Sequence, residues 1–112
     1  QPPPPPPPAA GAHGTATGPW PGQGDPEVEK FRKRIMWRES GNNYRIADPS
    51  HRWFGAYQFA MSASNTAAKR MKRPDLVGKP ANQWTPEEQD AAFYVMYDRG
   101  KGKRYWRVGK KK

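Results

Sequence analysis

Cysteine is absent from this 112-residue chain, which excludes both a disulfide framework and a cysteine-ligated zinc site. Two histidines without cysteine are too few for a typical zinc centre, so we expect no metal and no cofactor. The sequence also lacks any apolar run near the roughly 20 residues that a membrane-spanning helix needs, and we expect no membrane span. Aromatic residues must therefore supply most of the packing in a small core.

Charge is missing from the first 24 residues, which contain neither an acid nor a base. This segment begins with Gln1 and seven consecutive prolines and is rich in Ala, Gly and Thr, a composition that favours extended polyproline II over a packed core. The net charge of +10 belongs entirely to the remainder. We predict a disordered tail or linker over 1–24, one domain over 25–108 and a basic C-terminal tail over 109–112.

A first helix is predicted over 26–39. Asp25 can cap it, and Pro26 suits its first position. An apolar stripe follows at Val28, Phe31 and Ile35. The helix therefore has a defined start and one face directed at the core.

Glu39, in the last turn of this helix, falls on the same stripe. At about 100° per residue it lies roughly 20° from Val28, whereas Trp37 lies near 180°. Burial and the negative end of the helix dipole both favour the protonated form of a carboxyl group there. A carboxyl group that holds its proton can act as a general acid. An ion pair with a buried arginine, or fraying of the last turn, would explain Glu39 equally well.

The rest of the domain predicts two further helices. "TPEE" has the pattern of a capping box from Thr85 to Glu88, and its helix should end near Gly100. This helix is apolar on nearly all sides, so we expect it to be central and buried. A helix over 58–72 should precede it, and residues 40–57, rich in turn formers, can hold a short hairpin.

Among the other acids, Asp48 alone shares the irregular segment that follows Glu39. Most of the rest lie in first turns of helices, where capping and the helix dipole account for them: Glu27, Glu29, Glu87, Glu88 and Asp90. Asp48 is therefore the candidate for a second carboxylate in glycoside hydrolysis. It precedes Pro49 and Ser50, however, and turn chemistry favours a structural role there.

Two segments in this order, "ESGNNY" (39–44) and "FGAYQF" (54–59), resemble the Glu-Ser-Gly-Gly-Asn-Trp and Tyr-Gly-Gly-Leu-Gln-Phe signatures of the resuscitation-promoting factors of actinobacteria. More distantly they resemble goose-type lysozymes and lytic transglycosylases. Weaker similarity continues in "TPEEQDAAFYVM" and "YWRVG", so that it covers about residues 30–108. The resemblance implies an α+β, mainly helical, small lysozyme-like domain with a short irregular or hairpin segment at its cleft.

The resemblance also implies an activity: a glycosidase of lysozyme or lytic transglycosylase type that cuts the MurNAc–GlcNAc bond of peptidoglycan. Glu39 matches the family's catalytic glutamate, which serves as general acid and base, and Gln58 matches the glutamine beside it. Tyr44 and Tyr57 match positions near the cleft. We expect Trp53, in the loop between the two motifs, to bind substrate with them.

One departure from the family concerns cysteine. Members often carry a cysteine just before the catalytic glutamate and another near the C-terminus, whereas this chain has Arg38 and the segment "RVGKKK". The expected partners are peptidoglycan glycan strands and anionic cell-wall polymers, which attract a basic domain. We expect a monomer, and the resemblance implies that it is secreted, extracellular or in the cell wall, from a bacterium or a phage.

A different class of function is also compatible with the charge: a non-catalytic basic module that binds nucleic acid or cell-wall glycan. Support for nucleic acid comes from cations and aromatics in two places, Lys69, Arg70, Lys72 and Arg73 in one and Tyr105, Trp106 and the tail in the other. No recognised nucleic-acid motif accompanies them.

Overall fold

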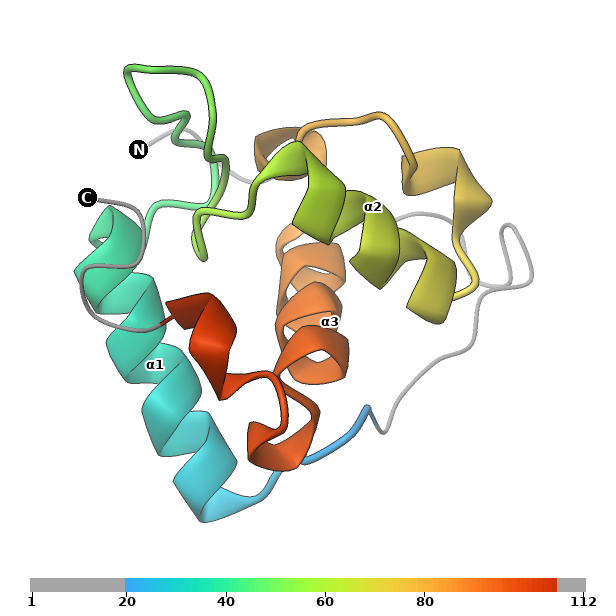
Figure 1. Ribbon diagram of the computed structural model, residues 1–112. Helices are drawn as coiled ribbons and strands as arrows, with labels where there is room; N and C mark the ends of the chain where they lie inside the picture. Colours follow the sequence, from blue (N-terminus) through green and yellow to red (C-terminus); the bar gives the residue numbers. More distant parts are fainter. Residues whose placement is uncertain (1–19, 107–112) are drawn as a thin grey trace.

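The computed structural model describes residues 20–106. Its three α-helices are α1 (Pro26–Ser40), α2 (Met61–Arg70) and α3 (Pro86–Tyr97), joined by the short 3-10 turns η2 (Pro74–Leu76), η3 (Ala81–Gln83), η4 (Asp98–Gly100) and η5 (Lys103–Trp106). Figure 1 shows α3 in the middle of the molecule, with α1 along one edge and α2 on the other side of α3. The prediction of a mainly helical domain is confirmed.

The β component expected for an α+β class is small. Within residues 20–106 no strand forms, and the irregular segment contains two isolated antiparallel bridges, Ala47 with Phe54 and Phe54 with Phe59. The N–H of Phe54 donates to the Phe59 carbonyl over 3.0 Å, and the N–H of Phe59 donates to the Phe54 carbonyl over 2.9 Å. The segment thus consists of turns joined by two isolated bridges and is not a hairpin with two strands.

The start of α1 follows the sequence signals. The Asp25 carboxylate accepts hydrogen bonds from the N–H groups of Glu27 and Val28, and Pro26 occupies the first position. Gly41 ends the helix in the left-handed conformation, with φ of 66°, and its N–H donates to the Trp37 carbonyl over 2.9 Å. The predicted helix is confirmed and is one residue longer than expected.

The central helix is α3, as predicted. The hydroxyl of Thr85 accepts from the Glu88 N–H, and the Glu88 carboxylate accepts from the Thr85 N–H, which completes the capping box. Phe93 is fully buried at mid-helix, and its ring lies 5.0–5.2 Å from the rings of three aromatics: Tyr57, Tyr97 and Trp106. The helix ends at Tyr97, earlier than expected, because Asp98 adopts the left-handed conformation.

The second helix is shorter than the predicted 58–72. Gln58 has a φ of 54°, which a right-handed helix excludes, and Phe59 belongs to a bridge, so α2 begins at Met61. At the other end the helix stops at Arg70, and Lys72 has a φ of 61°. The prediction from helix-forming composition was therefore too long at both ends of α2.

The boundary predicted between tail and domain moves toward the N-terminus. Trp20 packs against the core, and Gly22 is buried beside Val28. The Gly24 N–H donates to the Glu29 carboxylate over 2.9 Å. The domain therefore begins no later than Trp20. Residues 1–19 of the predicted N-terminal tail, residues 107–108 of the predicted domain and the predicted C-terminal tail, 109–112, lie outside the described residues.

Candidate functional site

The side chain of Glu39 lies on the inner side of α1. It is 10% exposed, whereas Trp37, two residues earlier, is 68% exposed. Ile35, one turn before Glu39 on the same stripe, is fully buried. The helix phase predicted from the sequence therefore holds in the fold, and it turns a carboxylate at the end of α1 away from solvent.

Arg38 connects Glu39 to the C-terminal part of the domain. Its Nη2 lies 3.3 Å from Glu39 Oε2 and also donates a hydrogen bond to the backbone carbonyl of Trp106. Trp106 is buried, and its indole N–H donates to the Tyr57 carbonyl over 3.2 Å. In a chain without cysteine, these polar bonds hold the end of α1 against η5.

Gln89 of α3 fixes the loop that follows Glu39. It is fully buried; its Oε1 accepts from the Ala56 N–H over 2.9 Å, and its Nε2 donates to the carbonyls of Tyr44 and Trp84 over 3.0 and 3.1 Å. All three bonds join side chain to backbone, so they set the path of the loop independently of its side chains. Sequence analysis assigned no role to Gln89, although a glutamine in a helix that is apolar all round signals a buried polar group with partners.

Gly55 leaves room for the Gln89 side chain, whose three bonds to the backbone we call the clamp. We expect Gly55→Ala to destabilise the fold by about 3 kcal/mol. A Cβ there would lie 2.4 Å from Gln89 Oε1, and φ is +81°. The matched control is Gly41→Ala, where φ is +66° but a Cβ would meet nothing within 4 Å. Its strain should cost only about 1 kcal/mol. Urea unfolding measures both variants, and equal losses would contradict the role of the clamp.

Gln58 and Trp53 line the same groove. The groove has a volume of about 120 Å³ and is lined by Trp53, Gln58, Phe59, Ala60, Ser62, Ala63, Tyr105 and Trp106. Gln58 keeps its left-handed backbone through two bonds to the Gly55 carbonyl, from its own N–H over 3.1 Å and from its Nε2 over 3.0 Å. Strain of this kind in a non-glycine residue concentrates at functional sites.

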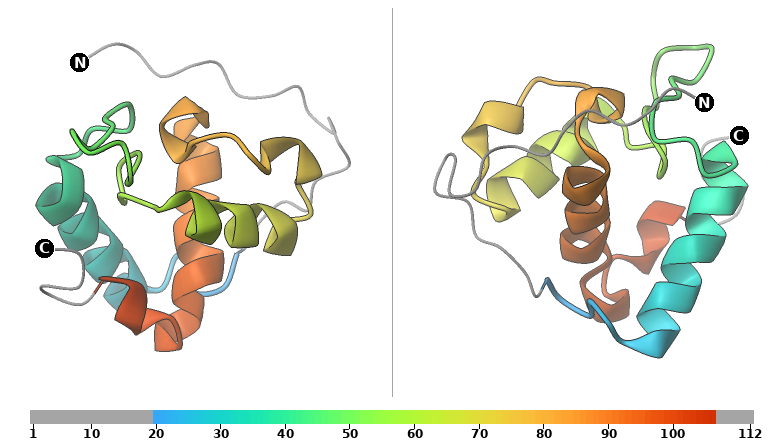
Figure 2. Two further views of the ribbon diagram at one scale, coloured as in Figure 1. Left: turned by 45° about the horizontal axis from the view of Figure 1, so that its top comes forward. Right: turned by 180° about the vertical axis from the view of Figure 1, so that it is seen from behind.

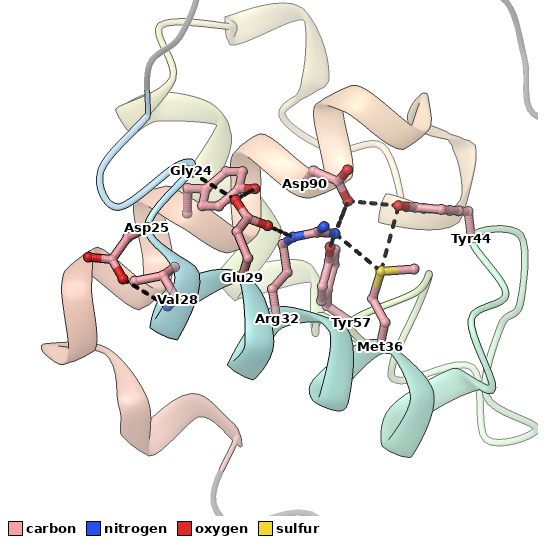
Figure 3. Close-up of polar contacts among 10 residues, drawn as sticks. Gly24, Asp25, Val28, Glu29, Arg32, Met36, Tyr44, Tyr57 and Asp90 are labelled. Carbon is pink, nitrogen blue, oxygen red and sulfur yellow. Dashed lines mark hydrogen bonds and ion pairs between the residues drawn. The ribbon is translucent and has the colours of Figure 1, made fainter.

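Tyr44 and Tyr57 lie elsewhere, in a polar network between α1 and α3 (Figure 3). Their hydroxyls donate to Asp90 Oδ1 over 2.8 and 2.6 Å, and Arg32 Nη1 donates to the Tyr57 hydroxyl over 3.0 Å and lies 3.5 Å from Asp90. Tyr57 is fully buried and presents no surface to a ligand in this structure. Both tyrosines instead fix the two ends of the loop that carries Trp53.

Asp90 is the centre of this network. From the sequence it was assigned only to the first turn of a helix, where the helix dipole favours an acid. Burial raises the pKa of its carboxyl group, against the opposing effects of the hydrogen bonds from Tyr57 and Tyr44 and of the Arg32 charge. Burial and the nearby Asp90 raise the pKa of both tyrosine hydroxyls. Tyr44 and Tyr57 therefore remain protonated donors at neutral pH.

Glu29 extends the network and predicts a dependence of stability on pH. Burial alone would raise the pKa of its carboxyl group, but hydrogen bonds from Tyr94, the Gly24 N–H and Arg32 lower it from 4.5 to about 2. A carboxyl group with a depressed folded-state pKa stabilises the fold above its unfolded pKa. This stabilisation is lost as pH falls from 4.5 toward about 2.

We therefore expect the free energy of unfolding to fall more steeply over this pH range in the wild type than in Glu29→Gln. The difference should be of the order of 2 kcal/mol after allowance for solvent screening. Urea unfolding at a series of pH values measures it. Parallel curves for the two proteins would contradict the assignment, and Glu27→Gln, an exposed acid in the same turn, is the control.

Asp48 lies in a tight turn. Its carboxylate accepts hydrogen bonds from the N–H of Ser50, over 2.9 Å, and from the Ser50 hydroxyl, and its carbonyl accepts from the His51 N–H over 2.7 Å. The Asp48 N–H donates to the Trp53 carbonyl over 2.8 Å. This geometry agrees with the structural role favoured by turn chemistry and orients the loop before Trp53.

The fold removes two residues from the surface proposed for nucleic acid. Arg73 is 5% exposed and its guanidinium is 2.8 Å from carboxylate oxygens of both Asp75 and Glu88. Trp106 belongs to the core. The expectation that these two residues contact nucleic acid is wrong, because ion pairing and core packing occupy them.

Within residues 20–106 no group of three or more His, Asp or Glu side chains gathers as metal ligands would, and no helix there is both long and apolar enough to cross a membrane. Comparison with known proteins found no matching family model, no matching curated protein and no matching solved structure.

Proposed function

We propose that this chain carries a lysozyme-like muralytic domain that cleaves the MurNAc–GlcNAc bond of peptidoglycan, with Glu39 as its general acid. The observation that supports this most strongly is the burial of the Glu39 side chain, 10% exposed, in a helix whose opposite face is open to solvent. The carboxylate is joined through Arg38 to Trp106, which lines the groove of Trp53 and Gln58. One side chain, Arg38, thus links the acid to a residue of the groove that we propose binds sugar.

The chemistry follows from these groups. Glu39 donates a proton to the glycosidic oxygen, and the bond from that oxygen to the anomeric carbon of the MurNAc unit breaks as an oxocarbenium-like sugar develops. The Arg38 guanidinium, 3.3 Å away, stabilises the carboxylate that remains after the proton has left. Glu39 then takes a proton from the incoming hydroxyl group and returns to its acid form.

Substrate contacts in this proposal come from the groove. The indole of Trp53 offers a flat face for a sugar ring, and the Arg52 guanidinium lies 4.8 Å from its centroid on one side. Gln58, held by its strained backbone, provides an amide for hydroxyl or N-acetyl groups. Tyr44 and Tyr57 act as positioning residues through Asp90.

Asp48 does not serve as the second carboxylate in this mechanism, because its Oδ2 accepts two bonds within its own turn. The sugar cation is captured either by the substrate's own C6 hydroxyl, which yields an anhydro product, or by water. Both routes need only Glu39 as base. The alternative, a basic module that binds wall glycan or nucleic acid without cutting it, shares the groove but requires no proton transfer from Glu39.

Purified peptidoglycan incubated with the wild type and with Glu39→Gln tests the proposal. The wild type should release soluble fragments and the variant should not, and the masses of the fragments separate an anhydro end from a hydrated reducing end. Equal release by both proteins would overturn the role of Glu39. Binding of insoluble peptidoglycan without release by either protein would establish the non-catalytic alternative.

A further inference from the structure

The outer face of α1 is basic and carries the most exposed aromatic side chain of residues 20–106. Lys30, Lys33, Arg34 and Trp37 lie within about 100° of arc, opposite Val28. All four are exposed, Trp37 to 68%. We call these four residues the basic face. Figure 2 shows α1 at the edge of the molecule in two further views, so no other described element covers this side.

The charges of the basic face are not neutralised by the fold. Among residues 20–106, none of Lys30, Lys33 and Arg34 forms an ion pair, whereas Arg32 and Arg73 pair with carboxylates. Lys33 and Arg34 follow Lys30 by three and four residues, so the three cations form a short row of about one turn along the helix. Such a row suits a chain with regularly repeated anions better than a single small ion.

A hollow beside the basic face extends it. Its volume is about 240 Å³, and it is lined by Glu27, Lys30, Phe31, Arg34, Tyr97 and Lys103. The rings of Phe31 and Tyr97 are stacked at 4.6 Å, and the Arg34 guanidinium lies 5.6 Å from the Phe31 centroid. Three cations therefore surround an aromatic floor, with Glu27 as the one acid among the lining residues.

We propose that the basic face binds a phosphodiester-linked anionic polymer of the cell wall, an inference that rests on the proposed muralytic function. Charge complementarity is its main support, because a polyanion gains from a row of cations that form no ion pair within residues 20–106. The Trp37 indole adds a flat apolar surface for the polymer's polyol or sugar units.

The position of the basic face also fits this partner. Glu39 and Trp37 lie on opposite sides of α1, so a polymer held on the outer face leaves the groove of Trp53 and Gln58 open. A wall offers both ligands at once, since anionic polymers and glycan strands occur together in it. Single-stranded nucleic acid is disfavoured, because it is usually held by a series of stacking aromatics and the basic face exposes only one.

The test uses Glu39→Gln protein, which leaves the wall intact, and measures its sedimentation with two preparations of wall sacculi. One preparation retains its phosphodiester polymer and the other has been stripped of it by acid. At about 50 mM salt we expect binding to the intact sacculi to be at least about ten-fold tighter, and the preference to shrink at about 300 mM salt. Equal binding to both preparations would overturn the proposal.

Two triple variants in this background locate the surface. Lys30→Gln/Lys33→Gln/Arg34→Gln should remove the preference for intact sacculi, whereas Lys69→Gln/Lys72→Gln/Lys79→Gln removes the same charge from exposed positions elsewhere and should keep it. Equal losses in the two triples would show that only net charge matters and would overturn the basic face. Trp37→Ala should weaken binding further at the higher salt.

Two further measurements distinguish a failure of the binding proposal from a failure of the proposed activity. Tighter binding of a single-stranded oligonucleotide than of the phosphodiester polymer, lost in the first triple, would assign the basic face to nucleic acid and overturn the wall polymer. With Glu39 restored, the first triple should solubilise stripped sacculi at the wild-type rate. If the wild type solubilises no wall, the proposed activity fails, and the comparison of intact and stripped sacculi still decides the binding surface.

Discussion

Glu39→Gln is expected to lower the rate of peptidoglycan solubilisation by about 10²–10⁴-fold, the usual contribution of a general acid or base. Gln keeps the shape of the side chain and one acceptor oxygen for Arg38, but its amide is too weak an acid to protonate the glycosidic oxygen. The side chain is 10% exposed at the end of the helix, and Gln can keep its contact with Arg38 there. The free energy of unfolding should therefore stay within about 1 kcal/mol of the wild type. Release of soluble fragments and urea unfolding measure the two effects separately.

Asp48→Asn is the matched control, since it neutralises the other carboxylate of the same region. Asn preserves acceptor capacity toward the Ser50 N–H, and Asp48 donates no proton in the proposed mechanism. Its rate should remain within about three-fold of the wild type. A loss comparable with that of Glu39→Gln would replace the single-acid mechanism with one that uses two carboxylates.

Asp90→Ala is expected to have the largest effect on stability, a loss of about 2–4 kcal/mol. The substitution leaves the hydroxyls of Tyr44 and Tyr57 without their shared acceptor and removes one carboxylate from Arg32, while Glu29 remains 2.7 Å from Arg32 Nε. Removal of one partner from a buried polar cluster costs more than the net value of its bonds. Urea unfolding provides the measurement.

Two controls isolate the cause. Asp90→Asn keeps an acceptor for the tyrosines and should lose only about 1–2 kcal/mol. Glu87→Ala removes an exposed acid from the same helix and should change stability by less than about 1 kcal/mol. The network would lose its proposed role if Asp90→Ala were no more destabilising than Glu87→Ala. Wall solubilisation should also fall in Asp90→Ala, because the loop that carries Trp53 loses its anchor at both ends.

Short-range signals in the sequence were sufficient for the starts of α1 and α3 and for the side of α1 on which Glu39 lies. Asp25 and the pair Thr85 and Glu88 bond to N–H groups within three residues, so local geometry alone determines these caps. The phase of Glu39 follows from helical periodicity over four residues from Ile35. Such features depend on backbone geometry and need no knowledge of the rest of the chain.

Longer-range contacts decided what the sequence could not. Gln58 begins no helix because it lies in the turn between the bridge partners Phe54 and Phe59, where its N–H and its Nε2 both donate to the Gly55 carbonyl and its backbone is left-handed. A helix propensity carries no information about a residue 33 positions away, and that is the separation between Ala56 and the Gln89 side chain that fixes it. The groove likewise brings Trp53 and Gln58 together with Tyr105 and Trp106, which are far away along the chain.

Arg73, Trp106 and Asp90 show the same limit of prediction from sequence. By composition, the first two belong to a basic binding surface and the third to a helix N-terminus. In the fold, Arg73 pairs with Glu88, Trp106 packs on Phe93, and Asp90 receives two tyrosine hydroxyls. The sequence determined which residues carry charge or aromatic rings, and the tertiary structure alone decided which of them face solvent, because burial depends on contacts between segments that are distant along the chain.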